Sequence, residues 1–335
     1  MFELADDWVW DSWLADDGET FHLFFLTAPK SLGDPALRHS HARVGHATSS
    51  DLTNWTRAAD AVGGSQPGYD DRAVWTGCVV RDAETWRMFR TGISLNEPGP
   101  VQRIGVDTSE DLFFWTPEGG PHWPLTADPN WYEKSETNEH WRDPWVVQDA
   151  GGLWHMYITA RLAPTYFPEV QGRGVVGHAV SVDLRRWQVA APLSAPGRME
   201  QLEVMQVVEL DGRWVMVFSC LGTEMVGAEG GAGSGGAEGG VWSVPIDGPG
   251  APVDLDRAVR ITDECVYVGR VIQDRAGQWQ FLAFVHRDPA GGFAGGIIDP
   301  VPIGWNDSAS ALELASSPVP WCEGLPRQGP AAPLA

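Results

Sequence analysis

One short phrase occurs three times in the sequence, and this repetition is the strongest constraint on the fold. The copies are VGHATSSDLTNW (44–55), IGVDTSEDLFFW (104–115) and VGHAVSVDLRRW (176–187). Each runs from a β-like stretch into an S-x-D-L turn and ends at Trp. Ser and Asp side chains hydrogen-bond the local backbone in such turns, so we expect Asp51, Asp111 and Asp183 to make turns. Repetition at this spacing predicts a fold built from similar units.

Strand candidates rich in aromatic residues occur five times, each after a second apolar run and a tight turn. They are FHLFFLT (21–27), WRMFRTG (86–92), WHMYITAR (154–161), WVMVFSC (214–220) and WQFLAFVHR (279–287). The fourth and fifth units lack a clear S-x-D-L turn. Five such units predict an all-β chain, a five-bladed β-propeller with four antiparallel strands per blade. We expect one domain over residues 1–335, with no C-terminal β-sandwich.

Charge and composition limit the partners. The net charge is −22, and a surface this acidic repels nucleic acids and anionic membranes but not a neutral oligosaccharide. No window approaches 18 uninterrupted apolar residues, so no membrane span is predicted. Most of the 18 Trp residues are expected to fill a β core, and the others are candidates for stacking on sugar rings.

The cysteines and the N-terminus bear on the compartment. The cysteines are Cys78, Cys220, Cys265 and Cys322, and they form no C-x-x-C pair and no zinc-like cluster. Such scattered thiols are typical of buried free cysteines in a reducing compartment. The N-terminal MFELADDWVWDSW is acidic and lacks the basic and apolar regions of a secretory signal. We therefore expect a cytoplasmic protein that needs no metal and no cofactor.

Carboxylates begin the innermost strand of three units. When the five units are aligned on the start of their second strand, the equivalent positions are Asp11, Asp143 and Glu203, with Thr76 in the second unit and Tyr267 or Val268 in the fifth. The innermost strands of a propeller line its channel, so these side chains are predicted to converge at one end of the channel. Three converging acids shift one another's pKa values, which can supply both a protonated acid and an ionised carboxylate at neutral pH.

The connection after the second strand of each unit is expected to emerge on the same face as the carboxylates. Residues 28–43 form one such connection and carry Arg38, His39 and His41. The Gly-rich connection at 221–240 has no Gly-Lys-Ser/Thr sequence, so it does not predict a phosphate site. It is interpreted either as a flexible surface insertion or as a mobile lid.

Four motifs in order resemble a known group of enzymes. VWDSW (9–13), WTG (75–77), WRDP (141–144) and the strand of Glu203 occur in the order seen in glycoside hydrolase families 32 and 68, the invertase, inulinase and levansucrase group. The resemblance covers essentially the whole chain. It implies a retaining β-fructofuranosidase or fructosyltransferase that acts on sucrose or fructo-oligosaccharides through a covalent fructosyl-enzyme.

The resemblance also implies a role for each motif residue. Asp11 would be the nucleophile, Asp143 would hold sugar hydroxyls and stabilise the transition state, and Glu203 would be the general acid and then the base. The implied substrate-binding residues are Arg142 beside Asp143, Thr76 near the nucleophile, Trp10 and Trp75 around the fructose, and His140 next to the RDP motif.

Alternatives remain at two levels. The acid strand reads EQLEVMQ rather than E-C-P or E-R-P, so Glu200 competes with Glu203, although the alignment of units favours Glu203. The repeated phrase also suits family 43 propellers, inverting α-L-arabinofuranosidases and β-xylosidases that use the same three positions. Carboxyl groups about 5–5.5 Å apart favour retention, and about 6.5–9.5 Å favour inversion. A second alternative is a carbohydrate-binding propeller without activity.

Overall fold

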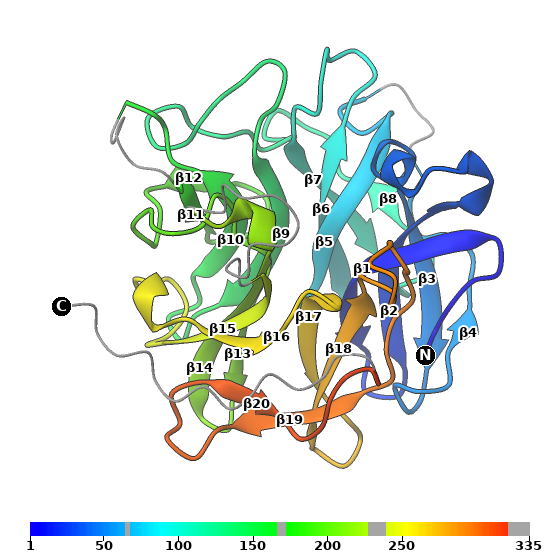
Figure 1. Cartoon of the computed structure of the whole chain (residues 1–335). Helices are drawn as coiled ribbons and strands as arrows, with labels where there is room; N and C mark the ends of the chain where they lie inside the picture. Colours follow the sequence, from blue (N-terminus) through cyan, green and yellow to red (C-terminus); the bar gives the residue numbers. More distant parts are fainter. Residues whose placement is uncertain (64–67, 166–171, 227–238, 321–335) are drawn as a thin grey trace.

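The computed structural model describes residues 1–63, 68–165, 172–226 and 239–320, and it is a β-propeller (Figure 1). Within these residues the strands form five sheets of four antiparallel strands, each in chain order from the innermost strand outward. The predicted fold class is thereby confirmed, including outer strands in the fourth and fifth blades, where the sequence showed no S-x-D-L turn.

Each blade is a simple meander. The first contains β1 (Asp7–Asp16), β2 (Phe21–Pro29), β3 (Arg43–Ser49) and β4 (Thr56–Arg57), and the second contains β5 (Ala73–Asp82), β6 (Thr85–Ile93), β7 (Arg103–Ser109) and β8 (Thr116–Pro117). The third contains β9 (Trp141–Gln148), β10 (Trp154–Arg161), β11 (Gly174–Ser181) and β12 (Gln188–Ala190). The fourth contains β13 (Glu203–Leu210), β14 (Arg213–Cys220), β15 (Gly240–Ile246) and β16 (Val259–Thr262). The fifth contains β17 (Val266–Gln273), β18 (Trp279–Val285), β19 (Val301–Trp305) and β20 (Leu312–Leu314).

The innermost strands close into a ring. Strand β1 contacts β5, β5 contacts β9, β9 contacts β13, β13 contacts β17, and β17 returns to β1 (Figure 1). Where the first and fifth blades meet, Phe2 N–H donates to Ile297 O at 2.8 Å, and Ile297 N–H donates back at 2.9 Å. The ring therefore brings the beginnings of five strands to one end of the molecule.

The repeated phrase is the connection from the third to the fourth strand of a blade. In its first copy the Ser49 hydroxyl donates to Asp51 Oδ1 at 2.9 Å, and the same oxygen accepts from the N–H groups of Thr53 and Asn54. The Ser109–Asp111 and Ser181–Asp183 turns repeat the first of these bonds. The three aspartates thus make turns, as the sequence predicts.

Backbone conformation and packing explain the leucine and the glycine of the repeated phrase. The Leu of each copy has a positive φ, 64° at Leu52, 68° at Leu112 and 59° at Leu184, and each side chain is buried in the core. A left-handed backbone is unfavourable for leucine, so the turn hydrogen bonds and the burial must offset that cost. At Gly105 a Cβ atom would lie 1.7 Å from the Tyr69 hydroxyl oxygen, so the packing there admits only glycine.

The expectation of four free cysteines is wrong. Cys78 and Cys220 are free and buried, but Cys265 is disulfide-bonded. Cys322 lies outside the described residues, as does most of the Gly-rich connection, residues 227–238. Since disulfides form mainly in oxidising environments, the cysteines do not support a reducing compartment. In the part of the chain that the structure describes, no helix has the length and apolar character to cross a membrane.

Buried histidine pairs occupy equivalent places in the first and third blades. His22 Nδ1 lies 3.0 Å from His46 Nε2, and His155 Nδ1 lies 3.0 Å from His178 Nε2. Both pairs stack, with ring centroids 5.1 and 5.3 Å apart. Burial, and then the charge of the partner, lower the pKa of His46 to about 3 and that of His178 to about 4. His46 and His178 are therefore neutral members of the core at physiological pH.

The pairs predict a specific loss of stability in acid. A folded-state pKa below the unfolded value of about 6.5 means that the unfolded chain takes up the proton first. The stability contribution is complete above about pH 6.5 and is lost as pH falls from there toward the folded-state pKa. Relative to a His46→Gln/His178→Gln double variant, we expect the wild type to lose about 2 kcal/mol for each histidine between pH 7 and pH 5.

Urea unfolding at several pH values measures this difference. The control is a His122→Gln variant, which replaces an exposed histidine and leaves both buried pairs in place. A difference between wild type and the double variant that does not change with pH would contradict the assignment of neutral, buried His46 and His178.

Candidate active site

The structure brings Asp11, Asp143 and Glu203 together, with Asp143 and Glu203 near the beginnings of β9 and β13 and Asp11 at the bulge in the middle of β1, not at the start of that strand as the sequence predicts. Arg142 touches two of them directly: its Nε lies 3.3 Å from Asp143 Oδ2, and its Nη2 donates to Glu203 Oε1 at 2.5 Å. The charge of Glu203 raises the pKa of both aspartates, and the charge of Asp11 raises that of Asp143. Three carboxyl groups from three blades therefore form one electrostatic cluster.

A bulge interrupts every innermost strand next to this cluster. The pairing with the second strand shifts between Trp10 and Ser12, between Trp75 and Gly77, and at the corresponding places in β9, β13 and β17. In the last three strands the bulge holds a residue with positive φ, 57° at Asp143, 52° at Val204 and 56° at Val268. Bulges of this kind redirect side chains, and they are common at active sites.

The bulges correct the predicted register of Glu203. Val204, not Glu203, has the backbone position of Asp143, so Glu203 corresponds to Arg142 one residue earlier. The sequence alignment of the units on their second strands did not account for the lengths of the hairpin loops. The loop between the paired residues Gln148 and Trp154 is one residue longer than that between Glu209 and Trp214. Glu203 nevertheless reaches the cluster because it begins β13, beside Arg142.

Hydroxyl groups of the second strands hold these bulges in place across the blade junctions. The bonds run from Asp143 N–H to Thr91 Oγ1 at 2.9 Å, from Val204 N–H to Thr159 Oγ1 at 3.3 Å and from Val268 N–H to Ser219 Oγ at 3.0 Å. The second, third and fourth blades thus each fix the bulge of the next blade, and the propeller itself positions this part of the site.

Asp11 is set to titrate near neutral pH. The Thr76 hydroxyl donates to Asp11 Oδ2 at 2.6 Å, so Thr76 supports this carboxylate, as the resemblance implies. Burial, partly opposed by the Thr76 hydrogen bond, raises the pKa of Asp11 to about 6. The charge of Glu203 acts in the same direction as burial, and those of Arg38 and Arg270 oppose it.

Asp143 is more deeply buried, with 4% of its surface exposed. Thr159 Oγ1 donates to its Oδ2 at 3.0 Å, and Arg142 lies on the same oxygen. Burial raises the pKa of Asp143 to about 7 against the opposing charge of Arg142. In the ligand-free state this carboxyl therefore holds a proton for part of the time at neutral pH.

The pKa of Glu203 is lowered, whereas those of Asp11 and Asp143 are raised. Burial by itself raises its pKa, but the charge of Arg142 and hydrogen bonds from Tyr267 and Arg142 outweigh burial and lower it. The Tyr267 hydroxyl donates to Oε2 at 2.5 Å. Burial and the charge of Glu203 raise the pKa of Tyr267 well above its usual value, so its hydroxyl remains a donor.

Glu200 is held away from this cluster. Arg161 Nη2 donates to Glu200 Oε2 at 2.6 Å, and Gly172 N–H donates to its Oε1 at 3.0 Å. Of the two candidate acids, Glu203 is therefore the one that Arg142 binds.

The predicted substrate-binding residues surround the carboxylates in different ways. Trp75 is partly exposed and its Nε1 donates to His39 O at 2.7 Å. Trp10 is only 1% exposed, with the His39 ring centroid 6.2 Å away and the Arg38 guanidinium 5.6 Å away. His140 Nδ1 lies 3.2 Å from Arg142 Nη1 and 3.2 Å from Gln201 Oε1. Trp75 is thus accessible to a ligand, whereas Trp10 lies behind His39 and Arg38.

Two arginines near Asp11 were absent from the predicted site. Arg38 lies on the 3-10 helix η2 (Pro35–Ser40), within the connection that the sequence placed on this face. Arg270 is buried on β17, where it donates to Ser12 O at 2.8 Å and Met205 O at 3.0 Å. Its only sequence signal is a charged residue inside the apolar run VYVGRVIQD. Both lower the pKa of Asp11 and so favour its ionised form.

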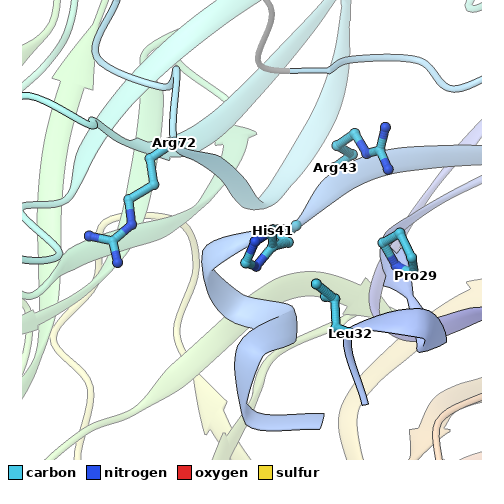
Figure 2. Close-up of a pocket in the computed structure, with 6 residues that line it drawn as sticks. Pro29, Leu32, His41, Arg43 and Arg72 are labelled. Atoms are coloured by element: carbon cyan, nitrogen blue, oxygen red, sulfur yellow. The ribbon is translucent and has the colours of Figure 1, made fainter. Parts of the chain in front are cut away.

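A separate cavity of about 220 Å³ lies behind the connection that carries η2. Its lining residues are Pro29, Leu32, His41, Ala42, Arg43 and Arg72 (Figure 2). The guanidinium groups of Arg43 and Arg72 point away from each other in Figure 2, so they do not converge on one anion. Across the described ranges, no group of three or more His, Cys, Asp or Glu side chains is arranged to hold a metal ion.

Comparison with known proteins decides the family. The profile of the glycosyl hydrolases family 32 N-terminal domain matches residues 13–231, about two thirds of the chain. The chain belongs to glycosyl hydrolase family 32. The family 32 assignment confirms the resemblance that the motifs carry, and the match includes Asp143 and Glu203 but begins after Asp11. No match was found among curated protein sequences.

Solved structures agree with the family 32 fold. The inulosucrase from Halalkalicoccus jeotgali bound to kestose superposes with a TM-score of 0.71 at 20% identity, over 96% of this chain and 92% of that one. The fructan 1-exohydrolase IIa from Cichorium intybus gives 0.66 at 18%, over 93% and 59%. A thermostable family-43 glycoside hydrolase gives 0.64 at 12%, over 98% and 97%. The family 32 chain thus spans less than two thirds of the exohydrolase, and these identities show the fold alone.

The hydrogen bond between Thr76 and Asp11 generates a prediction. Thr76→Val keeps the shape of the buried side chain but removes the hydroxyl that favours ionised Asp11. We expect the pKa of Asp11 to rise from about 6 by about one unit, as is usual when a carboxylate loses a close donor. Titration of ¹³C-labelled aspartate carboxyls by NMR measures the shift. Thr76→Ser, which keeps the hydroxyl, is the matched control, and equal shifts in both variants would contradict this role.

Proposed function

We propose that this chain is a β-fructofuranosidase or fructosyltransferase that acts on sucrose or fructo-oligosaccharides with retention of configuration. The observation that carries the proposal is the cluster of Asp11, Asp143 and Glu203 around Arg142, in a chain of family 32. Its structural neighbours include an inulosucrase bound to kestose and a fructan 1-exohydrolase in complex with 1-kestose. Its negative surface is compatible with such neutral sugars.

In the first step Asp11 attacks the anomeric carbon of the fructosyl group. Thr76 holds Asp11 Oδ2, which leaves Oδ1 for the new bond to carbon. The bond from the anomeric carbon to the bridging oxygen breaks, and Glu203 transfers its proton to that oxygen. Asp143 and Arg142 bind sugar hydroxyls, and the Asp143 carboxylate stabilises the positive charge that develops on the ring.

In the second step a water or a sugar hydroxyl replaces Asp11 on the anomeric carbon. Glu203 accepts the proton of the attacking hydroxyl and is protonated again, while Asp11 leaves as a carboxylate. The two displacements together retain the configuration. Water as the acceptor gives hydrolysis, and a second sugar gives transfer.

The ligand-free protonation state has to change before the first step. Glu203 must hold a proton and Asp11 must be ionised, whereas the pKa of Glu203 is lowered and that of Asp11 is raised to about 6. Arg142 is the largest opposing charge on Glu203. A sugar hydroxyl that engages Arg142 removes part of this stabilisation, so substrate binding itself favours protonated Glu203.

The inverting alternative uses the same three carboxylates with water attacking directly. Its support is the fold shared with a family-43 glycoside hydrolase. The anomer of the first sugar released from sucrose or 1-kestose, observed by NMR before mutarotation, separates the two mechanisms. We expect β-fructofuranose, and the α anomer would contradict retention. Arabinose or xylose release from aryl glycosides would favour the family-43 type of activity, and sugar binding without turnover would favour a binding module.

Single substitutions test the assigned roles. Asp11→Ala, Asp143→Ala and Glu203→Ala should each lower kcat for fructose release by at least about a thousandfold, because each removes a group that acts in the transition state. Thermal unfolding should show that the variants remain folded. Glu200→Ala is the control and should retain most of the activity, since Arg161 holds Glu200 outside the cluster. An inactive Glu200→Ala together with an active Glu203→Ala would reverse the assignment.

A further inference from the structure

A fourth carboxyl group, that of Glu224, lies beside the cluster and has no part in the mechanism above. It ends the 3-10 helix η3 (Gly222–Glu224), which follows β14 on the face of the carboxylates. The backbone is fixed, because Glu200 N–H donates to Glu224 O at 2.8 Å. The side chain is not fully satisfied: Oε2 is inaccessible to solvent, and no described residue hydrogen-bonds it.

Gln201 connects Glu224 to the pair of Arg142 and Glu203. Gln201 Nε2 donates to Glu224 Oε1 at 2.7 Å, which turns the amide oxygen of Gln201 toward Arg142. Arg142 Nη2 donates to that oxygen, and the same Nη2 donates to Glu203 Oε1 at 2.5 Å. Glu224 therefore fixes the orientation of an oxygen that binds the same nitrogen of Arg142 as Glu203 does.

Other charged and titratable groups also act on these two carboxyls. Facing Glu203 are Arg142 and Asp143 on β9, Asp11 on β1, Tyr267 on β17, His39 on η2, His140 before β9, Cys220 at the end of β14, and Glu224. Facing Glu224 are Glu203, Arg142, Arg161 on β10, Cys220 and Tyr267. Burial, and then the charge of Glu203, raise the pKa of Glu224 to about 7, so Glu224 changes charge in the working pH range.

We propose that Glu224 is a positioning residue for the general acid Glu203. Glu224 acts through Gln201 to weaken the contact of Arg142 with Glu203, and its own negative charge favours protonated Glu203. The inference rests on the proposed function, since Glu203 needs a proton only as a general acid. It assigns a purpose to the buried, unpartnered carboxylate oxygen, which is costly to keep in a site that already contains three acids.

The two effects of Glu224 have the same sign. Its negative charge disfavours a second negative charge on Glu203, and the Gln201 oxygen that it orients shares the positive charge of Arg142 Nη2 with Glu203. Both raise the pKa of Glu203. A neutral glutamine at position 224 removes the charge and leaves the amide of Gln201 free to turn. The pKa of Glu203 then falls, and the general acid loses its proton at a lower pH.

Comparison of Glu224→Gln with wild type tests the proposal. In the pH profile of kcat for sucrose, which reports the enzyme–substrate complex, the alkaline limb reports loss of the general-acid proton, and we expect it to move to lower pH by about one unit. At a pH above this limb, activity should fall about tenfold. Glu224→Asp keeps the charge and should restore the limb at least partly. Gln201→Leu removes the connection and should shift the limb in the same direction as Glu224→Gln.

Glu200→Gln is the matched control. It also removes one negative charge near Glu203 in sequence, but at a carboxylate that Arg161 holds. Its alkaline limb should stay at the wild-type position. An unchanged limb in folded Glu224→Gln, or an equal shift in Glu200→Gln, would overturn the inference. If Glu224→Gln does not fold, Gln201→Leu supplies the same measurement.

A titration without substrate separates this inference from the proposed function. NMR of ¹³C-labelled glutamate carboxyls gives the pKa of Glu203 directly, with its signal identified by its loss in Glu203→Gln. If the wild type turns over no fructoside but the pKa of Glu203 still shifts in Glu224→Gln, the proposed function is refuted and the connection of Glu224 to Glu203 stands. A wild type that releases fructose, with no shift in either measurement, would refute the inference alone.

Discussion

A single buried guanidinium, that of Arg142, holds together carboxylates from two blades. It contacts Asp143 on its own strand and Glu203 on the next innermost strand. Buried charges are stable only when they are paired and hydrogen-bonded, so Arg142 is what permits Asp143 and Glu203 to lie side by side, while the charges of Arg38 and Arg270 favour ionised Asp11. The same contact sets the chemistry, because Arg142 decides which carboxyl is ionised. Structure and reactivity therefore depend on the same few hydrogen bonds.

The propeller keeps that guanidinium in place through its backbone. Asp143, Val204 and Val268 have left-handed conformations that are unfavourable for residues other than glycine. A hydroxyl from the preceding blade hydrogen-bonds each of them, so the cost is offset by contacts between blades. Such a bulge cannot form in an isolated blade. The site is thus a product of the closed ring, which also explains why the side chains that build it are scattered along the sequence.

The sequence predicted the features that depend on local pattern. Five aromatic strands and a repeated turn were sufficient for the propeller, and the three acids do lie on innermost strands, although Asp11 stands in the middle of β1. The backbone register of Glu203 was wrong by one residue, because hairpin loops of different length are invisible until strands are paired. The contacts of Arg38 and Arg270 with the site, and the disulfide at Cys265, depend on which distant segments meet. Residue patterns alone do not contain that information.

The distribution of protons among the carboxyl groups depends on contacts that the shared propeller fold does not fix. The fold is shared with family 43, so the strands alone do not select retention or inversion. Here the pKa values of Asp11, Asp143 and Glu224 all lie at about 6 or 7, while that of Glu203 is lowered. Small changes in the contacts of Arg142 then suffice to move a proton between neighbouring carboxyls. Arg38 and Glu224, on connections after the second strand, adjust this balance without altering the strands.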